Sequence, residues 1–411
     1  MKIEIIPVGD EILIGQITDT NSAWMADKLT RKGFEINAIT TVGDCAQDII
    51  GAIDTALLRA DVVLMTGGVG PTKDDITKKT LCEYFQDQLI FSEDVLKNIE
   101  QLFARKKYTL NELTRNQAFV PENCFVIQNK AGTAPILWFE RKNKILVSMP
   151  GVPFEMKTAM NNEIIPRLQK HFLPVDYLKC SFLVSGITES ALALLLTGFE
   201  NRLPANFSLA YLPSYGLIRL RLSAWGNENL SELELQKEKL KQLLEHILID
   251  ESDKPIETIL GEKLRSKKLS ISVAESCTGG NIAHRITLVP GSSDYFEGGI
   301  VSYSNSIKTN VLNINSATIE KQGAVSEEVV ELMAKHISKT MQTDCSIAVS
   351  GIAGPDGGTP EKPVGTVWIC TQLHNKIVTQ KYQFGTSREE NINRATNMAI
   401  LQMIEMVNRE V

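Results

Sequence analysis

A glycine-rich segment, TGGVGPTKDDIT at residues 66–77, has the composition of a phosphate-binding loop. Glycines after a strand let backbone N–H groups approach a phosphate closely, and the start of the next helix adds partial positive charge. Asp74 and Asp75 fall at that expected helix start, where carboxylates are favourable in any case. The segment therefore fits either a phosphate cradle or a tight turn followed by a capped helix.

Acidic residues elsewhere favour the phosphate-binding interpretation. They follow other expected strands of the same region, and they are Asp10, Glu11, Asp44 and Glu155. Because ligands of an open α/β sheet bind beyond the carboxyl ends of its strands, we expect these side chains to converge there. Clustered carboxylates beside a phosphate cradle suit a divalent cation such as Mg²⁺ bridging a diphosphate. Each acid taken alone is also typical of a solvated surface charge or a helix cap.

A second segment of this kind, SCTGG at residues 276–280, follows an expected strand and opens an expected helix. Hydroxyls and backbone N–H groups at a helix start suit a nucleotide 5′-phosphate, and we favour this role over a second nucleophile. The residues expected to contact the phosphate are Ser276, Thr278, Gly279 and Gly280. Cys277 is expected to be a small buried residue rather than a catalytic thiol.

The segment SGIAGPDGGTPEKPVG at residues 350–365 is too rich in glycine and proline for regular structure. An ordered loop of that length usually serves a site, so Gly351 and Gly354 are expected to offer amides to an oxyanion or a ribose. The alternative is a long solvated connection. Arg388, near the start of the last expected helix, is either a phosphate or carboxylate contact or a surface charge.

The elements that must position these residues alternate between strands and helices. Residues 1–172 show a βαβαβ pattern, which predicts a doubly wound, mostly parallel sheet with helices on both faces. Residues 173–252 predict a small α+β module, and Asp253–Pro255 predict a linker. Residues 253–411 predict another α/β domain. The length of 411 residues agrees with two or three domains.

Composition and charge exclude several classes of protein. Hydrophobic residues make up 43% and charged residues 22% of the chain, which argues against disorder and coiled coils. A net charge of -6 argues against a broad nucleic-acid-binding surface. The first residues lack the pattern of a secretory signal, and seven scattered cysteines fit reduced thiols. We therefore expect a cytoplasmic protein.

The motifs GDEILIGQITDTNSAWMADKL, TGGVGPTKDDITKKT and MPGVPFEM resemble the N-terminal, molybdopterin-binding-like domain of the CinA (competence-damage-inducible) family. The resemblance implies a metal-dependent ADP-ribose pyrophosphatase. It assigns substrate contacts to Asn21, Gly67, Gly68, Gly70 and Thr133, and a divalent metal to Asp44, Asp75 and Glu155. Ile136 stands after Pro135 where the family usually has glycine, which predicts a changed pocket size there.

The motifs VAESCTGGNIAHRIT, PGSSDYFEGGIVSYSNSIKTNVL, GAVSEEVVELMA and SGIAGPDGGTPEKPVGTVWI resemble the C-terminal domain of the same family. This resemblance implies deamidation of nicotinamide mononucleotide (NMN) to nicotinate mononucleotide and ammonia, without a metal or other cofactor.

Amide hydrolysis needs a nucleophile, a base that later protonates the leaving amine, and donors for the oxyanion. Lys308 falls in the first turn of an expected helix, where the helix dipole disfavours its charged form. Tyr303 on the preceding strand is expected to relay or orient a proton. Ser293 is the expected nucleophile, and Ser292 is its alternative.

The middle module is similar to the KH-like insert of full-length CinA proteins. A KH fold clamps nucleic acid with a GXXG loop, which residues 175–250 lack, so we expect a dimerisation or spacing role instead. The expected partners are small nucleotides and a second copy of the chain, with no membrane. Two alternatives stay open: a pterin-binding or adenylyl-transfer N-terminal domain, and a non-catalytic scaffold of the competence or DNA-repair machinery.

Overall fold

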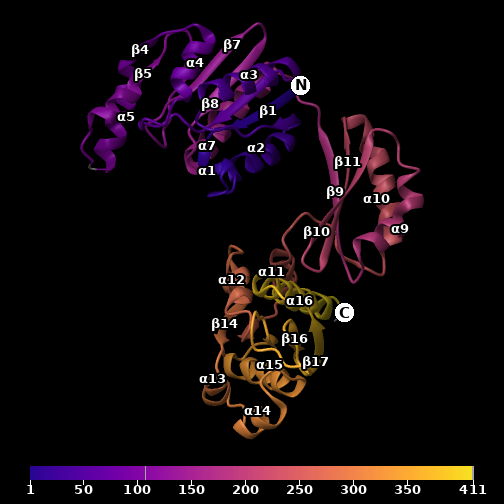
Figure 1. The fold of residues 1–411 in the computed structure, drawn as a ribbon. Helices are drawn as coiled ribbons and strands as arrows, with labels where there is room; N and C mark the ends of the chain where they lie inside the picture. Colours follow the sequence, from indigo (N-terminus) through magenta and orange to yellow (C-terminus); the bar gives the residue numbers. More distant parts are fainter. Residues whose placement is uncertain (107, 410–411) are drawn as a thin grey trace. The chain divides into compact units, whose positions relative to one another are not determined.

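The computed structural model describes residues 1–106 and 108–409 (Figure 1). The chain falls into two compact units, one of Met1–Leu178 with Trp225–Leu230 and one of Lys179–Ala224 with the residues from Ser231 onward. No helix among the described residues combines the length and the apolar character that crossing a membrane requires.

The first unit is built on a six-stranded sheet with the order β2-β1-β3-β8-β7-β6. In that order the strands are Glu35–Ile39, Lys2–Pro7, Val62–Thr66, Lys144–Met149, Ile136–Arg141 and Phe125–Ile127. Neighbours from β2 to β8 are parallel, and β7 and β6 are antiparallel. Every residue of β3 is buried, which is typical of parallel strands covered on both faces. The predicted mostly parallel sheet is confirmed.

Helices cover both faces of this sheet, as predicted. One apolar cluster includes residues of α2 (Thr20–Thr30), α7 (Pro153–Ala159) and α8 (Ile165–His171), with a π-helical turn at Met160–Ile164. The other includes residues of α3 (Ala46–Arg59), α4 (Thr77–Phe85) and α5 (Glu93–Lys106). Shorter elements complete the unit: α1 (Asp10–Leu13), β4 (Leu89–Phe91), α6 (Glu112–Arg115), a 3-10 turn (Asn116–Ala118) and β5 (Phe119–Pro121).

The middle module contains a four-stranded sheet with the order β10-β11-β9-β12. Its strands are Phe207–Ser214, Leu217–Trp225, Tyr177–Ser185 and Leu248–Asp250 in that order. Two helices, α9 (Glu189–Glu200) and α10 (Leu230–Leu244), and a 3-10 turn (Asn227–Asn229) accompany it. The predicted mixture of strands and helices is confirmed.

The C-terminal domain contains a five-stranded sheet with the order β14-β13-β15-β16-β17. The strands are Phe296–Val301, Ile271–Glu275, Cys345–Gly351, Thr366–Leu373 and Lys376–Gln383. The first three are parallel, and the last two are antiparallel additions. One apolar cluster draws on α11 (Ile256–Lys267), α12 (Asn281–Thr287) and α16 (Arg388–Asn408), and a second draws on α14 (Ser316–Gln322) and α15 (Glu327–Met341). A 3-10 turn (Ser292–Asp294) precedes β14, and α13 (Asn305–Asn310) follows it.

The middle module and the C-terminal domain share one apolar core within the second unit. Leu183 of β9 and Leu217 of β11 belong to the cluster that contains Ile256 of α11. The segment predicted as a linker is held in place, because Arg219 donates hydrogen bonds to the carbonyl oxygens of Ser252 and Lys254. The segment joins two packed parts rather than two independent ones.

Candidate functional sites

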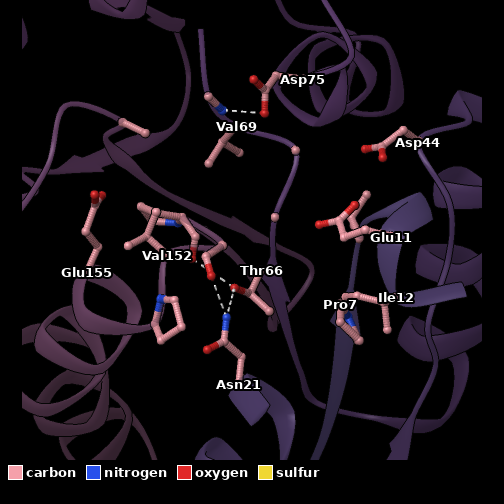
Figure 2. A pocket seen from close by; sticks show the side chains of 18 of the residues that line it. Pro7, Glu11, Ile12, Asn21, Asp44, Thr66, Val69, Asp75, Val152 and Glu155 are labelled. Carbon is pink, nitrogen blue, oxygen red and sulfur yellow. Dashed lines mark hydrogen bonds between the residues drawn. The ribbon is translucent and has the colours of Figure 1, made fainter. Parts of the chain in front are cut away.

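A pocket of about 410 Å³ opens at the carboxyl edge of the N-terminal sheet (Figure 2). The pairing register brings Pro7 of β1, Thr66 of β3 and Met149 of β8 to the same level, so the loops that follow them meet. The volume is in the range of small-molecule sites. All eight predicted N-terminal residues line it: Asn21, Asp44, Gly67, Gly68, Gly70, Asp75, Thr133 and Glu155.

The glycine loop is shaped by contacts within the protein. Gly67 has a φ of +111°, and a Cβ there would lie 2.1 Å from the Val8 carbonyl oxygen. Gly67 also donates its N–H to the Met149 carbonyl oxygen at 3.1 Å. This glycine is therefore required by the close approach of two protein segments, whatever the loop binds.

Asp75 closes the loop rather than starting the helix. Its carboxylate accepts hydrogen bonds from the Gly70 N–H at 2.7 Å and the Thr72 N–H at 2.9 Å, and also from the Thr72 hydroxyl. Helix α4 begins at Thr77, two residues later than the predicted start. The alternative in which Asp75 caps this helix is not what the structure shows, because the N–H groups that Asp75 accepts from belong to the loop itself.

Asp44 lies among other carboxylates. It accepts a hydrogen bond from the Asp10 N–H at 3.1 Å, and the Asp10 carboxylate accepts one from the Asp44 N–H at 3.2 Å. Burial raises the pKa of Asp44, and the negative charges of Asp10, Glu11 and Asp74 raise it further. Negative charge is therefore concentrated at this end of the pocket, where Figure 2 shows the neighbouring Glu11 and Asp44 side chains.

Glu155 lies at another part of the pocket wall. Its carboxylate accepts a hydrogen bond from the Asn129 side chain at 2.7 Å, and it packs against Gly132, where a Cβ would meet it at 2.0 Å. Ile136 does not line the pocket, because its side chain is 1% exposed within the apolar core of the sheet. The predicted change of pocket size at Ile136 is wrong.

The acids of this pocket do not form a metal cage. No group of three or more His, Cys, Asp or Glu side chains within residues 1–106 and 108–409 is arranged to hold an ion. Asp75 accepts hydrogen bonds from Gly70 and Thr72, and Glu155 accepts one from Asn129. The Asp44 carboxylate accepts one from the Asp10 N–H and lies near three other negative charges. The donor set fits an ion such as Mg²⁺ that shares one or two carboxylates with substrate phosphates.

A buried lysine is the centre of the C-terminal site. Lys308 is 1% exposed, and its Nζ donates hydrogen bonds to the Ser276 hydroxyl at 3.1 Å and the Ser302 carbonyl oxygen at 2.7 Å. A third contact joins Nζ to the Tyr303 carbonyl oxygen at 3.4 Å. The Ser304 hydroxyl caps α13, which carries Lys308. Burial lowers the pKa of Lys308, so the predicted direction holds with desolvation as its cause.

Ser276 is the serine beside Lys308, and the prediction that Ser293 takes this place is wrong. Strands β13 and β14 are parallel, with Ile271 opposite Phe296 and Glu275 opposite Val301. Ser276 follows the carboxyl end of β13, where Lys308 also lies. Ser292 and Ser293 precede the first residue of β14, at the opposite edge of the sheet.

The turn at residues 276–280 is not an empty phosphate nest. The Glu275 carboxylate, which is fully buried, accepts hydrogen bonds from the N–H groups of Gly280 at 3.0 Å, Ile282 at 3.1 Å and Ala283 at 2.8 Å. The Gly279 N–H donates to the Ser276 carbonyl oxygen at 3.1 Å. Both glycine amides predicted to bind a phosphate therefore already have acceptors within the protein. Thr278 is 3% exposed, and its hydroxyl has no partner among the described residues.

Tyr303 and Arg388 lie together beside this buried pair. One Arg388 nitrogen donates to the Tyr303 hydroxyl at 3.0 Å, and another donates to the Gly354 carbonyl oxygen at 2.8 Å. Tyr303 is 59% exposed, so the contact is open to a ligand. Gly354 thus contributes its carbonyl rather than its predicted amide, and Gly351 is the last residue of β15, opposite Val367.

Some residues of both sites were not predicted from the sequence. Glu275 carries no signal beyond its place at the end of a strand, and Gln117 lies in a 3-10 turn outside every quoted motif. Both are buried polar side chains. Their roles depend on which backbone groups the fold brings to them.

The two domains match two known families of domain. Residues 4–170 match the "Probable molybdopterin binding domain", and residues 253–407 match the "CinA C-terminal domain". The chain thus belongs to the class of proteins that join these two domains.

Similar proteins extend over the whole chain. A CinA-like protein of Flavobacterium psychrophilum is 44% identical over 100% of this chain and 99% of its own length. A CinA-like protein of Cytophaga hutchinsonii is 41% identical over 99% of this chain and 98% of its own length. The protein belongs to the CinA family. A crystal structure of a CinA superfamily protein from Klebsiella pneumoniae is 32% identical over 37% of this chain and 96% of that chain, with a TM-score of 0.37.

We predict that Glu275→Ala destabilises the second unit. The substitution leaves three N–H groups, of which that of Ile282 is buried, without their acceptor, so the free energy of unfolding should fall by at least about 2 kcal/mol. Urea denaturation followed by circular dichroism measures the change. Glu320→Ala on the exposed face of α14 is the matched control and should change the stability by less than about 0.5 kcal/mol. Equal effects of the two variants would contradict the assigned role of Glu275.

Proposed function

We propose that the C-terminal domain is a serine–lysine amidase that releases ammonia from NMN. One observation carries the proposal: the Lys308 amine lies 3.1 Å from the Ser276 hydroxyl, and both side chains are buried. A serine hydroxyl is a weak nucleophile until a neighbouring base accepts its proton. A lysine serves as that base when burial favours its neutral form.

The chain's own residues account for each proton in this reaction. Neutral Lys308 accepts the Ser276 proton as Ser276 Oγ bonds to the amide carbon, which gives a tetrahedral oxyanion. Collapse of that intermediate breaks the C–N bond, and the Lys308 ammonium protonates the leaving nitrogen to give ammonia. Water then attacks the acyl-serine with Lys308 again as the base, and the products are the carboxylate and free Ser276.

Other residues support binding and charge stabilisation in this proposal. The Thr278 hydroxyl, two residues after Ser276, is a buried donor without a partner among the described residues, and it is available to the oxyanion. Arg388 is exposed and offers its guanidinium beside Tyr303, which suits the phosphate of a mononucleotide. The choice of NMN as substrate rests on the family resemblance of the motifs around these residues.

We predict that Ser276→Ala and Lys308→Ala each lower ammonia release from NMN by at least a thousandfold, because each removes a partner of the proton transfer. Ser293→Ala is the matched control and should retain nearly full activity, since Ser293 lies at the other edge of the sheet. Coupled spectrophotometric detection of ammonia measures all three. Loss of activity in Ser293→Ala with retention in Ser276→Ala would reverse the assignment.

We predict that the amidase rate rises with pH, because the neutral Lys308 amine is the active form. Burial lowers the pKa of Lys308, so the rise of the rate with pH should level off below the ordinary pKa of a lysine. Below that point the rate should fall about tenfold for each unit of pH. The Cys277 thiol next to Ser276 has a pKa raised to about 12 and stays neutral in this range. A kcat/KM profile that is flat from pH 6 to pH 9 would contradict the role of Lys308.

We also propose that the N-terminal domain hydrolyses ADP-ribose to AMP and ribose 5-phosphate with a divalent cation. The pocket supports this proposal because its wall contains both the glycine loop and the cluster of carboxylates around Asp44. Asp44 and Glu11 would hold the cation, which would neutralise charge on the diphosphate when bound. The glycine loop and Asp75 would position the diphosphate. Binding of a pterin without hydrolysis of ADP-ribose would favour the alternative of a pterin-binding module.

We predict that Asp75→Ala lowers ADP-ribose cleavage at least tenfold and leaves ammonia release from NMN unchanged. The substitution removes the acceptor for the Gly70 and Thr72 N–H groups, so the loop loses its fixed shape. EDTA should abolish AMP formation and spare the amidase, since only the first site is proposed to need a metal. Product analysis by liquid chromatography measures both activities in one sample. Loss of both activities in either experiment would contradict the division between the domains.

A further inference from the structure

Two buried amide side chains flank the glycine loop of the N-terminal pocket. Asn21 at the start of α2 is 9% exposed, and Gln117 in the 3-10 turn before β5 is 2% exposed. Both line the pocket. Each has a side-chain carbonyl oxygen without a hydrogen-bond donor among the described residues.

Contacts on the nitrogen side fix the orientation of Asn21. Its Nδ2 donates to the Gly151 carbonyl oxygen at 2.7 Å and to the Thr66 hydroxyl oxygen at 3.5 Å, as the dashed lines of Figure 2 show. Thr66 in turn donates its own proton to the Pro150 carbonyl oxygen at 2.9 Å. Rotating the amide would place Oδ1 against the Gly151 oxygen, so Oδ1 stays on the other side as an acceptor.

Gln117 is oriented in the same way at the other end of the loop. Its Nε2 donates to the Val69 carbonyl oxygen at 3.4 Å, which leaves Oε1 as the atom without a partner. Thr66 and Val69 bound the segment Gly67–Gly68. Two acceptors with fixed orientation therefore lie on either side of the loop proposed to contact a diphosphate.

Buried polar atoms in proteins almost always have a partner. These two oxygens have none among the described residues and belong to side chains that line the pocket, so a bound ligand can supply the missing groups. An ionised phosphate group cannot be that partner, because it has only acceptor oxygens and no hydrogen to donate to a carbonyl oxygen. Hydroxyls of a sugar and the exocyclic amine of a base are suitable donors. We propose that Asn21 and Gln117 select ligands by accepting hydrogen bonds from a sugar or base that is attached to the phosphate group. This inference rests on the proposed N-terminal function and identifies the sugar or base as the part of the ligand that these two side chains recognise.

The test compares the full-length protein with Asn21→Leu and Gln117→Leu by isothermal titration calorimetry. The probes are ADP-ribose, AMP and ribose 5-phosphate, which carry hydroxyl or amine donors, and inorganic pyrophosphate, which carries only the anion. Titrations are run with Mg²⁺ and again with EDTA. Each variant should bind at least one donor-bearing probe roughly five- to tenfold more weakly and bind pyrophosphate unchanged.

Gln128→Leu is the matched control. Gln128 also has a buried side-chain oxygen without a partner among the described residues, but it does not line the pocket. The Gln128→Leu variant should therefore bind every probe with the wild-type affinity. Thermal unfolding of every variant checks that the domain is folded. A variant that unfolds is replaced by Asn21→Ser or Gln117→Met for the same titrations.

Three outcomes would overturn the inference: unchanged affinities in both variants, equal loss of pyrophosphate binding, or a wild-type protein that binds none of the donor-bearing probes. The proposed activity fails in a different way. A wild-type protein that binds ADP-ribose through Asn21 or Gln117 but forms no AMP would sustain the inference and reject the pyrophosphatase.

Discussion

The C-terminal site depends on the burial of one amine. Lys308 is almost fully buried, and the hydrogen-bond partners of its Nζ are uncharged oxygens. Two carbonyl oxygens and the Ser276 hydroxyl oxygen accept hydrogen bonds from its Nζ. An ammonium in such a place loses its hydration without gaining an opposite charge, so burial lowers the pKa of Lys308. The carboxyl ends of the parallel strands β13 and β14 lie at one edge of the sheet, which places Lys308 next to Ser276.

Parallel strands explain why both candidate sites lie where they do. In each domain the loops after neighbouring strands leave the sheet at the same edge, which brings residues distant in sequence into contact. The N-terminal pocket joins loops that follow β1, β3 and β8. The C-terminal site joins the residues after β13 and β14. One geometric rule thus positions two unrelated sets of side chains.

The limits of prediction from sequence follow from the same rule. The alternation of strands and helices was enough to predict both sheets, and it brought Asp44, Asp75 and Glu155 to one pocket. It did not distinguish Ser276 from Ser293, because a motif does not say which edge of the sheet its serine occupies. The sequence also did not show that Ile136 is buried in the core of the sheet. A departure from a family pattern marks a position but does not say whether its side chain faces the pocket or the core.

Both glycine-containing turns illustrate a further ambiguity in sequence. A turn with free N–H groups attracts an anion, but the anion can be a carboxylate of the protein itself. Asp75 fills this role for Gly70 and Thr72, and Glu275 fills it for Gly280, Ile282 and Ala283. These internal carboxylates fix the loops without a ligand. At the two candidate sites, the side-chain oxygens of Asn21, Gln117 and Thr278 have no partner among the described residues. A buried atom without a partner indicates a ligand where its residue also lines a pocket, as Asn21 and Gln117 do and Gln128 does not.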